Sequence, residues 1–133
     1  MCGIAGVFST KVEGISAGVA RMTDRIRHRG PDGDGIWVDL EAGIGLGHRR
    51  LSVQDLSEAG QQPMSSSSGR WVVVFNGEIY NHLDIRRDIG REAGTVWRGH
   101  SDTETLVRAI ELWGFEGALP RLVGMFAIAA WVS

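Results

Sequence analysis

The chain has 133 residues, 43% of them apolar and 23% charged, which is the ordinary composition of one globular domain. Its 16 acidic and 14 basic residues give a net charge of −2 without long blocks of one sign, which argues against nucleic acid as a partner. No apolar stretch reaches the ~18 residues of a membrane helix, no signal peptide is visible, and one cysteine suits a reducing compartment, so we expect a cytoplasmic protein without a membrane partner.

The first half of the chain predicts strands around one helix. Four apolar residues at helical spacing mark that helix: Ile15, Val19, Met22 and Ile26. The other predicted elements are, in order, a strand at 2–8, a glycine-rich loop at 27–35, a strand at 36–40, a turn at 41–43 and a glycine-rich strand at 43–48.

The second half predicts two strands and two helices. Asn76-Gly77 are turn residues that predict a hairpin, and Ser101 with Glu104 has the spacing of a capping box. The predicted elements are, in order, a flexible serine-rich surface loop at 65–68, a buried strand at 70–75, a helix capped by Asn81 that ends near Glu92, a helix from Ser101 with Leu106, Ile110 and Trp113 inside, and a strand at 125–132 buried on both faces.

This order of elements predicts a fold that combines α and β structure. Strands buried on both faces, separated by amphipathic helices, suggest sheets stacked inside helical layers. Periodicity leaves a doubly wound parallel sheet open as an alternative. The two hairpin signals, at 41–43 and at Asn76-Gly77, favour antiparallel pairing.

Cys2 is the only cysteine, and it directly follows the initiator methionine. Removal of Met1 would place a thiol and a free α-amine on one carbon, and an α-amine that titrates near about 8 can take the thiol proton without a histidine. On residue type alone, Cys2 could equally be an inert buried residue of the first strand.

Six segments in this order resemble the glutaminase domain of glutamine-hydrolysing asparagine synthetases, a class II glutamine amidotransferase with an N-terminal nucleophile. They are MCGIAGVF at 1–8, RHRGPDGDG at 27–35, GHRRLSVQD at 47–55, FNGEIYNH at 75–82, SDTET at 101–105 and LVGMFAIAAW at 122–131. The resemblance implies an α+β fold, the N-terminal-nucleophile four-layer α-β-β-α sandwich of antiparallel sheets. It also implies that 1–133 is a partial glutamine amidotransferase type 2 domain, incomplete at the C-terminus.

The resemblance implies three catalytic residues. Cys2 would attack the side-chain amide of glutamine and form a thioester, and Asn76 and Gly77 would bind the oxyanion. Their residue types suit these roles, because asparagine donates through its side-chain amide and glycine offers an unshielded backbone N–H. A plain Asn-Gly turn is the alternative, and the two roles can coexist.

The same resemblance implies the substrate-binding residues. Arg50 would bind the carboxylate of glutamine and Asp102 its ammonium, with Glu78, Leu51 and Val53 as further contacts. A bidentate arginine suits a carboxylate. A solvated strand-end charge at Arg50 and a helix N-terminal acid at Asp102 are the simpler alternatives.

No metal site is predicted, because no histidine has partners at metal-ligand spacing. We expect structural hydrogen bonds from His28 and His48, and Arg29 or Asp32 to brace the glutamine pocket.

No cofactor is expected in this chain. Family members continue with further strands and an ATP- and Mg-dependent synthetase domain, whose loop resembles SGGxDS and is absent from these 133 residues. The expected partners are L-glutamine and a synthetase domain or subunit that accepts ammonia, with a homo-oligomer possible. The same hydrolase serving another acceptor, and a non-catalytic truncated remnant that exposes an unpaired final strand, are the alternative interpretations.

Overall fold

The structure is a computed structural model that describes residues 1–52 and 57–133. In this part of the chain the strands form two antiparallel three-stranded sheets, with the orders β1-β3-β2 and β4-β5-β6. The strands are β1 (Gly3–Phe8), β2 (Gly33–Asp39), β3 (Ile44–Arg50), β4 (Met64–Ser65), β5 (Trp71–Ile79) and β6 (Gly124–Val132). The main helices are α1 (Ile15–Arg25), α2 (His82–Ala93) and α3 (Asp102–Ala118), and short 3-10 turns lie at Arg27–Arg29, Glu58–Gly60 and Leu119–Arg121.

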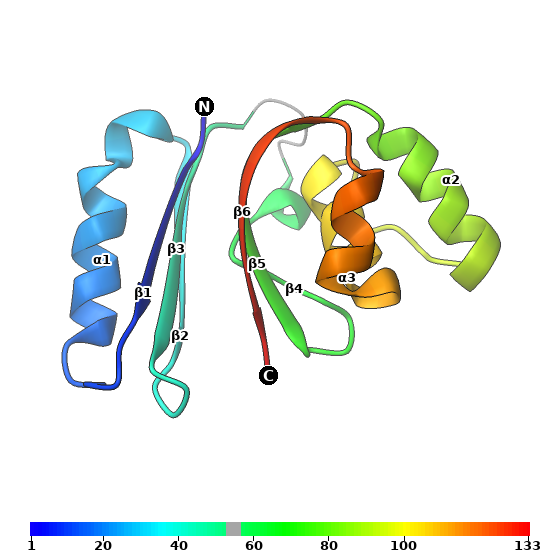
Figure 1. The fold of residues 1–133 in the computed structure, drawn as a ribbon. Helices are drawn as coiled ribbons and strands as arrows, with labels where there is room; N and C mark the ends of the chain where they lie inside the picture. Colours follow the sequence, from blue (N-terminus) through cyan, green and yellow to red (C-terminus); the bar gives the residue numbers. More distant parts are fainter. Residues whose placement is uncertain (53–56) are drawn as a thin grey trace.

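The layers follow the order helix, sheet, sheet, helix, as Figure 1 shows. Helix α1 covers the outer face of the first sheet, and α2 and α3 cover the outer face of the second. The inner faces of the two sheets bury Ile44, Leu46, Val72 and Val74 against each other. The predicted four-layer antiparallel sandwich is therefore confirmed.

The glycines of β3 allow α1 to lie close to the sheet. A Cβ added to Gly45 would lie 3.1 Å from the Ile15 side chain and 3.2 Å from that of Val19. The close neighbour of the glycine-rich strand is thus this helix. Met22 of the predicted helical stripe is exposed, and Thr23 is buried in its place.

Strand β5 corrects the predicted hairpin at Asn76-Gly77. It runs without interruption through both residues and pairs along its length with β6, where Asn76 lies opposite Ala127 and Gly77 opposite Phe126. Asn-Gly favours a two-residue turn only when the following strand pairs back on the preceding one, and here β6 supplies the partner instead. The hairpin predicted at 41–43 is confirmed between β2 and β3.

Other boundaries shift by a few residues. The predicted loop at 27–35 ends early, because β2 begins at Gly33, and β3 continues past His48 to Arg50. The serine tract is ordered, since Ser66 is buried and its backbone N–H donates to the Trp71 carbonyl. No helix in 1–52 or 57–133 is long and apolar enough to cross a membrane.

The last strand forms where expected and packs on both faces, but it is only partly buried. In β6, Met125 is 55% exposed and Val132 is 41% exposed, whereas Ile128 is only partly buried against the core. The strand lies at the edge of its sheet, but both faces of its second half are packed, since Ile128 and Ala130 lie against the core next to α2 and α3, and Ala129 and Trp131 lie against the core between the sheets.

Candidate active site

A pocket of about 260 Å³ lies where the ends of both sheets meet the start of α3. It brings together each predicted site residue that the structure describes, and Val53 lies outside the described residues. The predicted residues that line it are Cys2, Arg50, Leu51, Asn76, Gly77, Glu78 and Asp102. They lie directly before β1, at the end of β3, at the end of β5 and in the first turn of α3.

Cys2 lies half-buried in this pocket beside the backbone of Leu51. The Leu51 N–H donates to the Cys2 Sγ at 3.3 Å, and the thiol lies 3.6 Å from the Leu51 carbonyl oxygen. Met1 lines the pocket too and is 66% exposed, so its peptide bond to Cys2 is near the surface. An accessible thiol with a fixed N–H donor suits a nucleophile better than an inert core residue.

The loop after α1 holds the thiol segment in place. Arg29 Nε donates to the Cys2 carbonyl oxygen at 3.0 Å, and the Asp32 carboxylate accepts from the Ser52 N–H at 2.8 Å. Asp32 also donates its backbone N–H to the Arg50 carbonyl oxygen. Both residues expected to brace the pocket therefore contact its wall.

Gly77 occupies a backbone position that no other residue could take. Its φ is +151°, and a Cβ there would lie 2.2 Å from the Met125 carbonyl oxygen and 2.5 Å from the Phe126 Cα. The requirement for glycine thus arises from the close approach of β6, and Asn76 and Gly77 line the pocket as parts of a rigid strand.

Asp102 is buried at the first residue of α3. One of its carboxylate oxygens accepts the Ile79 N–H at 2.9 Å, which joins the helix start to the end of β5. Burial raises the pKa of this carboxyl, and the Ile79 hydrogen bond and nearby His82 oppose the rise. A bound ammonium would favour its ionised form in the same way.

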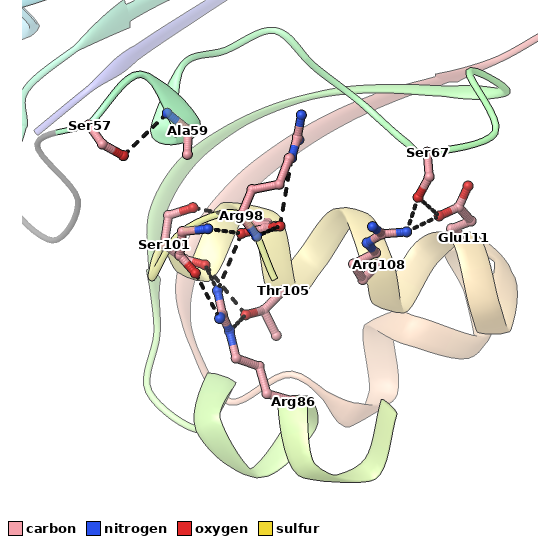
Figure 2. Close-up of polar contacts among 11 residues, drawn as sticks. Ser57, Ala59, Ser67, Arg86, Arg98, Ser101, Thr105, Arg108 and Glu111 are labelled. Carbon is pink, nitrogen blue, oxygen red and sulfur yellow. Dashed lines mark hydrogen bonds and ion pairs between the residues drawn. The ribbon is translucent and has the colours of Figure 1, made fainter. Parts of the chain in front are cut away.

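A second polar cluster fixes the segment that leads into Asp102. Ser101 caps α3, since its Oγ accepts the Glu104 N–H at 3.2 Å, which confirms one half of the predicted capping box. Glu104 does not complete it, because its carboxylate accepts from the Arg98 and Gly99 N–H groups at 2.9 Å. Arg86 of α2 reaches the same turn, where it bonds the Ser101 carbonyl and the Thr105 hydroxyl (Figure 2).

The predicted cap at Asn81 is corrected. Asn81 precedes α2, but its side chain makes no cap bond. It accepts from the Val123 N–H at 2.9 Å and donates to the Arg121 carbonyl oxygen at 2.9 Å. It therefore ties the start of α2 to the segment that enters β6.

The pocket wall also includes residues that the sequence did not mark as site residues, among them Gln62, Thr103 and Met125. Gln62 lies outside the quoted motifs, whereas Thr103 and Met125 lie inside SDTET and LVGMFAIAAW but were assigned no role there. His48, expected to make a structural hydrogen bond, does so with the Phe75 carbonyl oxygen at 3.2 Å. Burial lowers the pKa of His48 to about 4, so its ring is neutral near pH 7. Within the described ranges, no group of three or more His, Cys, Asp or Glu side chains could hold a metal ion.

Two curated relatives match almost the whole chain. A putative glutamine-hydrolysing asparagine synthetase of Mycobacterium tuberculosis H37Rv is 35% identical over 145 residues, covering 98% of this chain and 22% of that protein. Asparagine synthetase 1 of Bacillus subtilis is 38% identical over 135 residues, covering 98% and 21%. The chain therefore spans about a fifth of the length of these relatives.

The fold has a solved counterpart as well. The glutamine phosphoribosylpyrophosphate amidotransferase of Bacillus subtilis, solved with ADP and GMP, matches 98% of this chain and 34% of its own with a TM-score of 0.68 and 19% identity. At that identity the likeness concerns the fold. The family described as the glutamine amidotransferase domain matches residues 1–133. With this match over its whole length and a pocket that gathers a cysteine with the Asn-Gly pair, the chain belongs to the glutamine amidotransferase domain family.

Proposed function

We propose that this domain hydrolyses the side-chain amide of glutamine through a Cys2 thioester and passes the ammonia to a synthetase domain or subunit. The observation that carries the proposal is the shared pocket, in which the Cys2 sulfur faces the same cavity as Asn76 and Gly77. Arg50 and Asp102 line that cavity from different layers, so one cation and one anion can bind the two ends of the glutamine backbone.

The reaction follows from these positions. Once Met1 is removed, the Cys2 α-amine takes the thiol proton and the sulfur attacks the amide carbon of glutamine. The carbonyl electron pair moves to oxygen, where the Asn76 side chain and the Gly77 N–H stabilise the charge. The amine then returns the proton to the departing nitrogen, ammonia leaves, and water hydrolyses the thioester to glutamate.

The proposal also concerns the domain or subunit that accepts the ammonia. Relatives named as asparagine synthetases support an acceptor that makes asparagine, and ATP and Mg²⁺ would be bound by that acceptor rather than by this domain. The single cysteine suits the cytoplasm as the compartment. Asparagine formation that requires both glutamine and ATP, measured on the whole protein that carries this domain, tests the acceptor.

The test of the nucleophile compares two N-termini. Protein that begins at Cys2, verified by mass spectrometry, should release glutamate and ammonia from glutamine, whereas protein that retains Met1 should not, because its Cys2 nitrogen is a peptide nitrogen. Cys2→Ala should lose turnover and keep glutamine binding. Equal turnover by the Met1-retaining protein would show that the amine is not the base, and an active Cys2→Ala would reject the nucleophile.

A further inference from the structure

On the β4 side of β5, the backbone N–H and the backbone carbonyl of Phe75 are held by side chains rather than by a strand. On β5, Val72 and Val73 pair with β4, and the next residues of that register would be Pro63 opposite Val74 and Gln62 opposite Phe75. β4 begins only at Met64, so no strand residue pairs with Phe75 on this side. The Gln62 side chain takes over, because its Oε1 accepts the Phe75 N–H at 2.6 Å.

His48, which lies on the opposite sheet, holds the backbone carbonyl of Phe75. Its Nε2 lies 3.2 Å from the Phe75 carbonyl oxygen. A carbonyl only accepts hydrogen bonds, so Nε2 carries the hydrogen. The His48 Nδ1 is then an acceptor, buried and without a hydrogen-bond partner among the described residues. With 1% of its surface exposed, the ring is a fixed spacer between β3 and β5.

Gln62 is itself immobilised. Its Nε2 donates to the Thr103 hydroxyl at 3.3 Å, one residue after Asp102. The backbone carbonyl oxygen of Gln62 lies against Gly35 of β2, and a Cβ added to Gly35 would be 2.0 Å from it. The contacts to Phe75 therefore connect the first sheet, the second sheet and the first turn of α3.

These bonds act next to the Asn-Gly pair. In an antiparallel strand, the N–H and C=O of one residue point to the same side, and those of the next residue point to the other side. Because the Phe75 groups point to the β4 side, alternation directs the Gly77 N–H to that side as well, where β4 has ended and the pocket begins. The direction of the Gly77 N–H thus depends on how Phe75 is held.

We propose that His48 and Gln62 are positioning residues, which clamp the backbone carbonyl and the backbone N–H of Phe75 and so aim Asn76 and Gly77 at the reacting oxygen. The proposal rests on the glutaminase function proposed above. Neither side chain needs to touch the substrate for this role. Displacement of the clamp weakens donors that matter most in the transition state, so it should lower kcat more than it changes KM.

The kinetic test uses one disruptive and one conservative variant of His48. His48→Leu removes the donor to Phe75, and we expect kcat to fall by about 10- to 100-fold with KM for glutamine changed less than about twofold. His48→Gln places an amide donor near the former Nε2 and should recover most of kcat. Val72→Ala, a core change on β5 outside the clamp, should lower stability and leave kcat unchanged.

A second measurement separates this proposal from the glutaminase assignment. The amide ¹⁵N–¹H signals of Phe75 and Gly77 should shift in His48→Leu and return toward wild type in His48→Gln, whether or not glutamine is the substrate. Should His48→Leu not fold, Gln62→Met serves as the second variant, because it removes the acceptor of the Phe75 N–H. Unchanged kcat and signals in the disruptive variant, or a folded His48→Gln that recovers neither, would overturn the clamp. A wild-type protein without glutaminase turnover but with these shifts would overturn only the proposed function.

Discussion

Asn76 and Gly77 show how the meaning of two residues depends on their surroundings. The pair is the standard signal for a tight hairpin turn, yet here it lies inside β5, and its glycine is required because β6 passes within 2.5 Å of where a Cβ would be. Both residues face a pocket that also holds Cys2 and Arg50. The chemistry proposed for them needs donors that do not move, and a paired strand supplies that rigidity better than a turn.

The roles proposed for two pocket residues predict opposite kinetic effects. Asn76→Ala should lower kcat by on the order of 10²–10³, since an oxyanion donor acts mainly in the transition state. Arg50→Ala should mainly raise KM, because a carboxylate contact binds substrate and transition state alike. Steady-state kinetics of glutamate release measure both parameters. Interchanged phenotypes would reject the role assignment even though both residues line the pocket.

At the scale of elements, the junction of α2 and α3 is held by one partly buried arginine. Arg86 donates to the Gly99 and Ser101 carbonyl oxygens at 2.9 Å and to the Thr105 hydroxyl at 2.8 Å, and lies 3.7 Å from the buried Glu104 carboxylate. The guanidinium also stacks over Trp97 at 4.0 Å. This network sets the start of α3 and therefore the place of Asp102.

Neighbouring arginines of α2 provide a matched test of that network. Arg86→Met should destabilise the protein by about 3 kcal/mol, because it leaves the Gly99 and Ser101 carbonyl groups without this donor and removes one of the cations beside the buried Glu104 carboxylate. Arg87 pairs with Asp84 on the exposed side of the same helix, and Arg87→Met should cost less than about 0.5 kcal/mol. Urea unfolding measures the free energy of unfolding of both variants. Equal decreases in the two variants would show that Arg86 does not link α2 to α3.

For the whole molecule, the site exists because three of the four layers meet at one end. Arg50 ends a strand of the first sheet and Cys2 directly precedes another, Gly77 belongs to the second sheet, and Asp102 belongs to the helical layer beside it. The distance from helix α1 to the first sheet depends on missing side chains in β3, where a Cβ at Gly47 would lie 1.9 Å from the Thr23 hydroxyl oxygen. The glycines at this contact allow α1 to pack closely on the first sheet.

Two glycine substitutions test the layer spacing. Gly47→Ala should destabilise the protein by roughly 1–3 kcal/mol, since the added methyl group forces α1 away from the sheet. Gly90 of α2 has no atom within 4 Å of an added Cβ, so Gly90→Ala should raise stability by about 0.5–1 kcal/mol through helix propensity. Thermal unfolding shows whether each substitution raises or lowers the stability of the protein. A stabilising Gly47→Ala would show that α1 can move away from the sheet at no cost.

Several features follow from local sequence alone. Strands 2–8 and 70–75, and the helices near Val19 and Ile110, were predictable because period and apolar character act over a few residues. The pocket residues were named from motifs, and those within the described ranges line one cavity. Cys2 stands out by composition, as the single cysteine beside the N-terminus.

Only the tertiary structure decided which distant groups meet. His48 and Phe75 are 27 residues apart and Gln62 and Thr103 are 41 apart, so no local pattern predicts their bonds. The fate of Asn76-Gly77 was likewise decided by β6, about 50 residues later in the chain, because backbone pairing depends on which strand arrives alongside. Residue types set the chemistry available to this chain, and the packing of its sheets set which of those residues can act together.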